Sequence, residues 1–561
     1  MVNVFQITNG GGQFHVRKFL KWLPIKIRAK FGERRENRIR KHLDEIRRGN
    51  GDIRRDREWI PLYFLYRQSD DPAPDTVDDN TWGDLEMDEV FARIDRTVSV
   101  IGRQFLYAML RIYKNGRSDE EKQRLNALYS IFQTDEALRE KIQMALYSLR
   151  RDESAYLITL LHENLPAKSK YSWLVYVCSG LFFLSIVLMI AINSVFFFAA
   201  LAMALCNILI NAFYGSAIFR QCPDLGCFSA MLRAVGKLAR IAAPTGIREF
   251  DTLRKLKDFA AALNGKVFWF SLNEERMDAL TAALYGFLNH FGLFRLVVFM
   301  RIIDDLQKSR DKIRMIFEAI GSLDACVAIA SWLQNVPISA VPSFDEDNES
   351  GASGIIDVKG MYHPLIENAV GNSFFLSGES ALITGSNMAG KTSFIKTIGI
   401  NMILAQTIFI VLAERAGMPR RFVRSSIKRE EQVMDGQSYY SREIELLREF
   451  LNCSENRYLF LIDEIFRGTN TIERVAISAA TLRYLTGKNM VLVTTHDIEL
   501  QPLLSDCARL FHFSEQVDGD RYYFDFVLRD GPCHAGNAIR LIELKGYPPD
   551  IVTEARRLAG K

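Results

Sequence analysis

The segment ALITGSNMAGKTSFIK, residues 381–396, decides the fold of this 561-residue chain. Three apolar residues that end a predicted strand lead through Thr384 into Gly385, and the pattern G-x-x-x-x-G-K-T closes at Thr392. Glycines at 385 and 390 let the backbone curl so that its amide groups face a phosphate, with a helix N-terminus behind them. The segment therefore predicts a phosphate-binding loop between a strand and a helix.

The positions of this loop have different expected tasks. Lys391 is placed to reach the β- and γ-phosphates of a nucleotide, and Thr392 to ligate Mg²⁺. ATP and Mg²⁺ are therefore the predicted cofactors. The residues predicted to bind the nucleotide are Gly385, Ser386, Asn387, Met388, Ala389, Gly390, Lys391, Thr392 and Ser393.

Two later strands are each followed by side chains that suit ATP hydrolysis. The apolar run 458–462 ends in Asp463 and Glu464, and the run 491–495 ends at His496. Asp463 is expected in the Mg²⁺ coordination sphere with Thr392, and Glu464 is expected to orient or deprotonate the attacking water. His496 suits a sensor of the γ-phosphate. The predicted catalytic residues are Glu464, Lys391 and His496.

These blocks resemble the MutS family of DNA mismatch repair proteins, which has an ABC-type nucleotide-binding fold. The similar segments are GSNMAGKTS at 385–393, DEIFRGTNT at 463–471 and THDIEL at 495–500. The resemblance extends upstream to 85–111, 322–332 and 360–367, which are similar to parts of the family's helical core and to the lead into its ATPase domain. It implies a dimeric ATPase that acts on DNA.

The resemblance also assigns roles outside the three motifs. GQSYYSREI at 436–444 is similar to the family's signature segment, which implies that Ser438 acts in trans on the partner's nucleotide in a homodimer with composite sites. Phe374 falls where the family stacks an aromatic ring on adenine, with Phe375 beside it. Two phenylalanines of the hydrophobic core are the alternative interpretation. Residues 534–558 resemble a terminal helix-turn-helix that helps two ATPase domains to pair.

Between the two halves of the predicted helical core lies a long uncharged stretch. Residues 171–219 contain no Asp, Glu, Lys, Arg or His. About 20 apolar residues cross a bilayer as a helix, so 171–192 and 195–218 predict two transmembrane helices joined by a turn at Asn193 and Ser194. Lys168, Lys170 and Arg220 place positive charge at both flanks, as in cytoplasmic loops. A buried hairpin in a soluble core is the alternative.

The fold class that follows is an α/β P-loop NTPase domain, ABC-type and MutS-like, C-terminal to an all-α helical core with an inserted two-helix transmembrane hairpin. The predicted order is a basic arm at 1–79, core at 80–170, hairpin at 171–219, core at 220–345, ATPase domain at 346–529 and a dimerisation segment at 530–561. A chain that is 48% hydrophobic and 25% charged is globular, which excludes disordered and collagen-like classes. Eight cysteines indicate reduced thiols.

The amino-terminal arm carries an excess of positive charge. Residues 1–60 hold 16 Lys or Arg against 7 Asp or Glu, which suits a membrane surface or nucleic acid, or else a solvated arm. It lacks the features of a cleavable signal peptide. We therefore expect the chain in the inner membrane of the cell, with the ATPase and both termini cytoplasmic.

The departures from the family limit what the ATPase can be expected to do. About 80 residues of basic arm are too few for a separate mismatch-reading domain, and Phe31-Gly32-Glu33 lacks the rigid minor-groove platform that such a wedge needs. We expect a membrane-anchored ATPase that couples ATP to DNA binding. The alternative is an ATP-switched module that tethers or remodels membranes without DNA. A transporter fits poorly, because the hairpin holds no charge that marks a substrate path.

Overall fold

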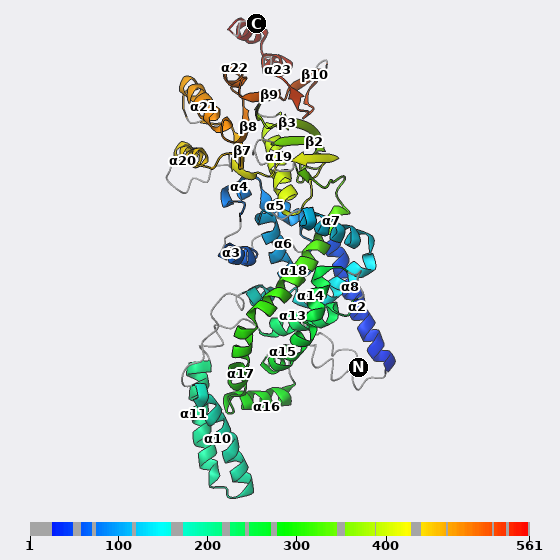
Figure 1. The fold of residues 1–561 in the computed structure, drawn as a ribbon, viewed down its shortest axis with the longest axis vertical. Coiled ribbons are helices and arrows are strands. Elements are labelled where there is room, and N and C mark those ends of the chain that lie inside the picture. Colours follow the sequence, from blue (N-terminus) through cyan, green and yellow to red (C-terminus); the bar gives the residue numbers. More distant parts are fainter. Residues whose placement is uncertain are drawn as a thin grey trace. The chain divides into compact units, whose positions relative to one another are not determined.

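A computed structural model describes most of the chain (Figure 1). The described residues are 25–48, 58–69, 75–114, 119–158, 172–215, 225–241, 246–270, 278–344, 354–386, 389–427, 439–466, 469–518, 521–533 and 538–558. They form two compact units. The first, here the helical unit, takes in 1–69, 95–108 and 128–331, and the second, here the sheet unit, takes in 70–94, 109–127 and 332–561.

The helical unit contains no described strand. Its helices are α2 (Ile25–Arg47), α3 (Leu62–Ser69), α8 (Glu136–Leu146), η1 (Tyr147–Leu149), η2 (Asp152–Ile158), α10 (Ser172–Ala191), α11 (Phe196–Ile210), η3 (Asn211–Gly215), α13 (Leu225–Leu238), α14 (Arg248–Lys255), α15 (Lys257–Phe270), α16 (Ala279–His290), α17 (Phe294–Lys308) and α18 (Arg310–Leu333). Helices α6 (Val100–Arg111) and α7 (Asp119–Thr134) each contribute residues to both units. The unit thus joins sequence from both sides of the predicted hairpin.

Helix α18 forms the centre of this unit and carries a buried carboxylate. Asp324 accepts hydrogen bonds from the backbone N–H groups of Val98 and Ser99, at 3.1 and 2.7 Å, and from Ser99 Oγ at 2.6 Å. These bonds satisfy backbone donors at the start of α6, as a helix cap does. Gly102 lies against the same carboxyl group, where a larger side chain would collide with it.

The buried carboxyl group predicts a pH dependence for the helical unit. Burial raises the pKa of Asp324 to about 6, whereas its ordinary value is 3.8. The folded state therefore binds a proton at Asp324 more tightly than the unfolded state, so the contribution of this group to the free energy of unfolding is greatest below pH 4 and is lost as the pH rises through 6. Between these two pH limits, the contribution of Asp324 to the free energy of unfolding changes by about 3 kcal/mol. We expect hydrogen exchange in peptides covering 98–108 to slow markedly from pH 7 to pH 5, after correction for intrinsic exchange rates.

The control for this prediction lies on the same helix. Asp324→Asn is expected to remove the pH-dependent part of the protection, because asparagine does not titrate. Asp311→Asn, at an exposed position of α18, is expected to keep it. Equal pH dependence in the two variants would show that another group is responsible.

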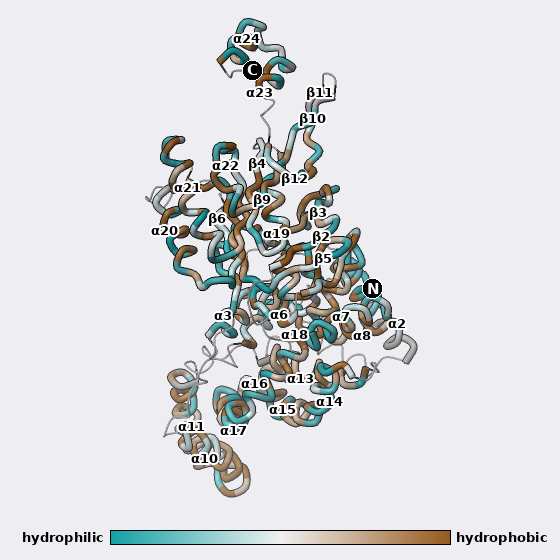
Figure 2. Tube along the Cα trace, turned by 45° about the horizontal axis from the view of Figure 1, so that its top comes forward, coloured by the Kyte–Doolittle hydropathy of each residue, from teal (hydrophilic) through white to brown (hydrophobic). Residues whose placement is uncertain are grey.

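Helices α10 and α11 form an antiparallel hairpin with an apolar surface. Figure 2 shows both helices in predominantly hydrophobic colours. Large apolar side chains point outward along the hairpin, and Leu184, Ile190 and Phe198 are 51, 77 and 71% exposed. The first residues of α10 and α11 and the last residue of α10 lie within one position of the bounds of the predicted spans. Residues 171 and 216–218 of those spans lie outside the described residues.

Within the described residues, three helical segments are long and apolar enough to cross a membrane, and a bent pair would make a fourth. The segments are α10, Phe196–Phe213 and α18, and the pair is α16 with α17. Burial distinguishes these segments. Only 22% of the apolar 18-residue stretch of α10 is buried, whereas 89% of the corresponding stretch of α18 is buried. Helix α18 is therefore a core helix of the unit, whereas the hairpin leaves its apolar surface open.

The sheet unit contains a six-stranded sheet in the order β12-β9-β4-β8-β7-β6. Its strands are β4 (Ser380–Thr384), β6 (Phe422–Ser426), β7 (Tyr458–Asp463), β8 (Met490–Thr495), β9 (Ala508–His512) and the antiparallel edge strand β12 (Arg529–Asp530). The five other strands are parallel. Their registers pair Thr384 with Thr495 and Asp463 with Thr494, so the predicted site residues follow strand ends along one edge.

Helices cover both faces of this sheet. Leu461 of β7 contacts α19 (Lys391–Thr407) so closely that a Cβ on Gly399 would lie 2.5 Å from its side chain. Its neighbours on β7, Phe460 and Ile462, face the other way into a cluster with α20 (Tyr439–Leu451) and α21 (Thr471–Thr486). Alternation along a strand buried on both faces explains why residues 458–462 are continuously apolar.

A second sheet in the order β1-β5-β2-β3 lies in the same unit. It comprises β1 (Ser343–Phe344), β2 (Ile355–Met361), β3 (Asn372–Ser377) and β5 (Arg415–Met418). The smaller elements are the hairpin of β10 (Glu515–Asp518) and β11 (Arg521–Phe524), the short helix α22 (Leu500–Leu504), and the terminal helices α23 (Ala538–Leu544) and α24 (Pro549–Leu558), which contact each other.

The structure divides the predicted first half of the core, 80–170, between the two units. Helices α4 (Asp79–Asp84) and α5 (Met87–Ile94) belong to the sheet unit. Asp84 explains this, because its carboxylate accepts hydrogen bonds from Ser425 Oγ at 2.8 Å and from the Ile427 N–H at 3.0 Å, at the end of β6. The resemblance at 85–111 predicts helices here, but it does not predict that Asp84 bonds to residues more than 300 positions away in the sequence.

Candidate nucleotide site

The phosphate loop leaves β4 and ends at the N-terminus of α19. Gly385 and Gly390 have φ angles of +145° and +96°, which residues with side chains rarely adopt. A Cβ on Gly385 would also lie 2.6 Å from the carbonyl oxygen of Phe513. Local geometry thus requires glycine at both motif positions.

Lys391 lies inside the loop and is 2% exposed. Its Nζ donates to the carbonyl oxygens of Gly385 and Ser386, both at 2.8 Å. Ser386 Oγ is buried and has no hydrogen-bond partner among the described residues. An ammonium group beside an unsatisfied hydroxyl and curled backbone fits the phosphates of a nucleotide, toward which Lys391 would turn.

The two predicted Mg²⁺ ligands are in direct contact. Thr392 Oγ1 donates to Asp463 Oδ2 at 2.9 Å, and Thr494 Oγ1 donates to the other carboxylate oxygen of Asp463. Mg²⁺ prefers oxygen ligands and usually takes one or two from protein, with the rest from phosphates and water. Thr392 and Asp463 fit that pattern. Within the described ranges, no cluster of three or more His, Cys, Asp or Glu side chains offers a different metal site.

Glu464 stands beside His496 at the same edge of the sheet. Its backbone is held at φ +56° by a hydrogen bond from its N–H to the carbonyl oxygen of Thr494, at 2.9 Å. The carboxylate is buried, and its Oε2 lies 3.5 Å from Nδ1 of His496, which is 43% exposed. A strained backbone at a strand end is typical of a functional site. The arrangement suits a general base with an accessible imidazole next to it.

Sequence reasoning missed a buried ion pair that supports this histidine. Arg474 of α21 donates two hydrogen bonds to Asp497, at 2.9 and 2.7 Å. Asp497 Oδ1 also lies 3.6 Å from His496 Nε2, so carboxylates flank the imidazole on both sides. A bidentate pair fixes orientation as well as charge. The position of Asp497 directly after His496 was the available signal, but its partner is 23 residues away.

A second missed residue fixes the loop after the acidic strand end. Glu443 of α20 is buried, and its Oε1 accepts a hydrogen bond from the backbone N–H of Phe466 at 2.7 Å. Phe466 has a φ of +57°. Glu443 lies in the segment that resembles the family's signature, so this segment is tied to the loop that follows Glu464.

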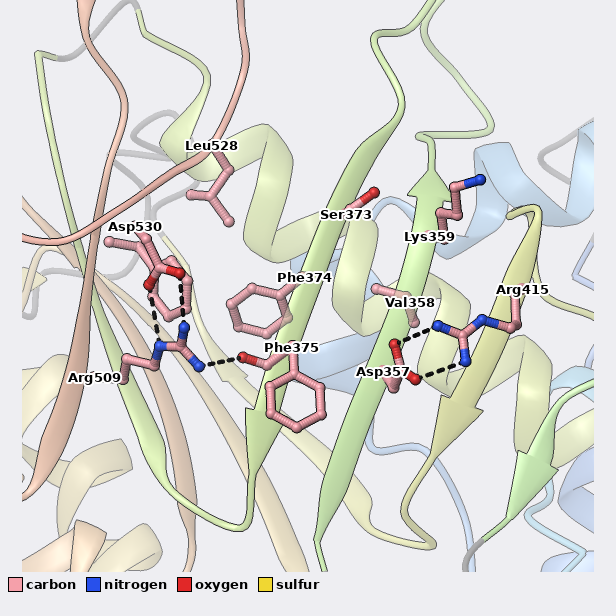
Figure 3. Close-up of a pocket in the computed structure, with 11 residues that line it drawn as sticks. Asp357, Val358, Lys359, Ser373, Phe374, Phe375, Arg415, Arg509, Leu528 and Asp530 are labelled. Carbon is pink, nitrogen blue, oxygen red and sulfur yellow. Dashed lines mark hydrogen bonds and ion pairs between the residues drawn. The ribbon is translucent and has the colours of Figure 1, made fainter.

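Phe374 is buried, whereas its neighbour Phe375 is exposed. Phe374 is 3% exposed and packs against Phe394 and Phe511, with ring centroids 5.4 and 5.0 Å apart, whereas Phe375 is 48% exposed. Figure 3 shows both rings in a pocket whose charged walls are already paired, Arg509 with Asp530 and Arg415 with Asp357. Stacking of adenine on Phe374 therefore requires that ring to leave its cluster, and Phe375 is the accessible aromatic.

Phe526, which belongs to no recognised motif, also lies against the phosphate loop. A Cβ on Gly390 would lie 3.2 Å from the ring of Phe526. Asn372 holds the backbone on both sides of that ring, donating to the carbonyl oxygen of Phe526 at 3.0 Å and accepting from the N–H of Leu528 at 2.8 Å. Phe526 is 45% exposed and therefore available to a ligand.

Three predicted nucleotide-binding residues, Asn387, Met388 and Ser438, lie outside the described residues. Ala389 is buried, and Ser393 lies in the first turn of α19. The described geometry brings together Gly385, Ser386, Lys391, Thr392, Asp463, Glu464 and His496. The trans role of Ser438 remains a prediction.

Comparisons with known proteins agree with this geometry. Residues 381–561 match the family model of MutS domain V. The DNA mismatch repair protein MutS of Natronomonas pharaonis is 29% identical over 277 residues, which cover 47% of this chain and 31% of that protein. MutS of Chloroflexus aurantiacus is 29% identical, covering 46% and 28%, and MSH3 of Phaeosphaeria nodorum is 27% identical, covering 46% and 24%.

The domain is of the P-loop ATPase type, because it combines the phosphate loop 385–392 with the acidic strand end at Asp463 and with His496. Residues 381–561 carry a domain of the MutS domain V family. The chain covers less than a third of the length of these relatives.

Proposed function

We propose that this chain is a membrane-anchored, MutS-type ATPase that couples ATP binding and hydrolysis to DNA binding, in mismatch repair or another DNA transaction. The observation that carries the proposal is the contact of Thr392 with Asp463 at 2.9 Å, beside Lys391 in the loop and Glu464 next to His496. Lys391 binds the phosphates, Thr392 and Asp463 hold Mg²⁺, and Glu464 activates water while His496 senses the γ-phosphate. The bound metal neutralises charge on the phosphates.

DNA is proposed as the ligand for two reasons. The curated relatives are named as DNA mismatch repair proteins, and residues 1–60 of this chain are strongly basic. Helix α2 (Ile25–Arg47) lies in this basic arm. Lys and Arg contacts with phosphates supply affinity without reading sequence. Pairing of two chains at composite sites, with Ser438 of each chain on the other's nucleotide, belongs to the same proposal.

The membrane part of the proposal rests on the hairpin α10–α11. Its apolar side chains are exposed over lengths of 20 and 15 residues, and its 18-residue windows are only 22 and 17% buried. An exposed apolar surface of this length fits the hydrocarbon core of a bilayer. We propose the inner membrane as the location, with the ATPase and both termini cytoplasmic.

The same hairpin favours a second candidate function. An ATP-driven switch fixed to a bilayer could tether or remodel membranes through protein or lipid partners without DNA. In that case the basic arm binds anionic lipid, with about 1 kcal/mol gained per Lys or Arg near the surface.

The test is ATP turnover by detergent-solubilised protein, with and without homoduplex, mismatched and branched DNA. We expect DNA to raise turnover several-fold, and we expect Glu464→Gln to lower turnover at least about a hundredfold while ATP still binds. Glu455→Gln is the matched control, because Glu455 is exposed and pairs with Lys488 away from the site. Turnover that no DNA changes, together with vesicle binding that requires the basic arm, would favour the second function.

A further inference from the structure

The corner between α16 and α17 is built onto the hairpin. The two helices are bent by 68° at the break 291–293, where Leu293 has a φ of +53°. Gly292 lies at this break, and a Cβ there would come 2.7 Å from the ring of Phe183 of α10. The corner therefore approaches α10 as closely as a glycine allows.

Two polar side chains of the hairpin hold this corner. Ser179 Oγ of α10 donates to the carbonyl oxygen of Gly292 at 2.7 Å, and Asn207 Nδ2 of α11 donates to the carbonyl oxygen of Phe291 at 2.6 Å. Asn207 is fully buried. Both carbonyls lie at the end of α16, where backbone acceptors lack helical partners. Unsatisfied carbonyl groups are costly in an apolar environment. By donating to these carbonyls, Ser179 and Asn207 therefore stabilise the contact of the corner with the hairpin.

Helix α16 presents an apolar face that stays largely exposed among the described residues. Leu280, Leu284 and Phe287 are 81, 60 and 43% exposed, and their spacing puts them on one side of the helix. Tyr285 and Asn289 are buried on the other side. No Asp, Glu, Lys or Arg occurs from 279 to 294. The face resembles that of the hairpin in chemistry and adjoins it, because Phe287 packs against Phe182 of α10 at 6.0 Å.

The docking point lies near the open end of the hairpin. Ser179 is seven residues beyond the start of α10, which corresponds to about 10 Å along the helix axis. Trp173, 56% exposed, lies at the same end, and tryptophan is typical of membrane–water interfaces. Figure 1 shows α16 running crosswise to α10 and α11. If the hairpin spans a bilayer, a helix in this place runs along the bilayer surface.

We propose that α16 is an interfacial helix, with Leu280, Leu284 and Phe287 inserted among the lipid acyl chains just below the headgroups. Ser179 and Asn207 fix its depth by holding the α16–α17 corner against the hairpin. The inference rests on the proposed insertion of the hairpin. It adds that the helical unit itself lies against the lipid surface, rather than being tethered to it only by two helices.

The test measures depth at three positions of the full chain in phosphatidylcholine–phosphatidylglycerol vesicles. An environment-sensitive fluorescent amino acid replaces Leu284 of α16, Leu184 of the hairpin or the exposed Gln307 of α17 in turn. The quenchers are lipids brominated near the headgroup or near the chain end. We expect shallow bromine to quench the probe at 284 about threefold more than deep bromine, the reverse at 184, and no quenching at 307.

The possible results distinguish the interfacial position of α16 from the membrane insertion of the hairpin. A probe at 284 that bromine does not quench, with quenching at 184, would overturn the interfacial helix and leave the membrane hairpin standing. If the probe at 284 is not quenched but its emission is blue-shifted, protein such as a second copy of the chain covers the α16 face. That outcome also overturns the interfacial helix. No quenching at 184 would overturn the hairpin insertion and this inference together.

Variants of the docking residues supply an independent readout. Ser179→Ala combined with Asn207→Leu is expected to reduce the shallow quenching at 284 at least about twofold, with quenching at 184 unchanged. The matched control is Ser185→Ala, because Ser185 is buried in the same helix but donates to Phe182 of its own helix, at 2.7 Å. Equal quenching in the docking and control variants would contradict the role of the two side chains.

Discussion

Replacement of Lys391 by alanine is expected to lower both ATP affinity and ATP turnover at least about a hundredfold, or 2.7 kcal/mol. Lys391 is the only described lysine whose ammonium group lies within the loop, where it donates to Gly385 and Ser386. With nucleotide bound, the same group faces the β- and γ-phosphates. Without it, only the backbone N–H groups and the proposed Mg²⁺ offset the phosphate charge. Titration with a fluorescent ATP analogue and a phosphate-release assay measure the two effects.

The matched control is a lysine on the same helix. Lys396 of α19 pairs with Glu86 at 2.6 Å, outside the phosphate loop. Lys396→Ala is expected to bind and hydrolyse ATP like the parent chain. If Lys391→Ala hydrolysed ATP at the parent rate, the proposed site would be wrong. A melting curve for each variant separates loss of the site from loss of the fold.

Two arginines in the hairpin are expected to release the protein from membranes. Leu184 and Leu201 are 51 and 47% exposed near the middle of α10 and α11. An arginine at the centre of a membrane helix costs about 3 kcal/mol, so Leu184→Arg with Leu201→Arg weakens insertion by about 6 kcal/mol. We expect the parent chain to remain in the membrane pellet after alkaline carbonate extraction and the double variant to move largely to the supernatant.

The control makes the same chemical change elsewhere. Leu65 of α3 and Leu503 of α22 are 51 and 42% exposed, outside the hairpin. Leu65→Arg with Leu503→Arg is expected to stay in the pellet. A parent chain that carbonate extracts completely would mean that the hairpin packs against protein, and the membrane part of the proposal would be withdrawn.

The sequence predicts the parts of the site that depend on local pattern. The loop motif places a strand before Gly385 and a helix after Gly390, and the structure has β4 and α19 there. Continuous apolar runs that end in Asp463 and His496 predict buried parallel strands. Since carboxyl ends of parallel strands meet at one edge, the approach of these residues follows from the motifs together.

Interactions across long sequence separations escape this reasoning. Asp84 could not be assigned to the end of β6, because a charge near a short helix gives no indication of its distant partner. The choice between Phe374 and Phe375 depends on which face of β3 is covered, and adjacent residues of a strand always point in opposite directions. The pairing of Arg474 with Asp497 depends on how α21 is placed beside β8.

The position of the hairpin within the helical unit has a consequence for biosynthesis. Ser99 and Asp324, which meet in the core of that unit, are separated by 225 residues, and the hairpin is synthesised between them. At ordinary rates of translation, the hairpin leaves the ribosome on the order of ten seconds before α18 is complete. If the hairpin is the proposed membrane anchor, targeting to the membrane begins on a nascent chain whose helical unit has not yet acquired helix α18, and that unit completes its folding only after the anchor has been delivered.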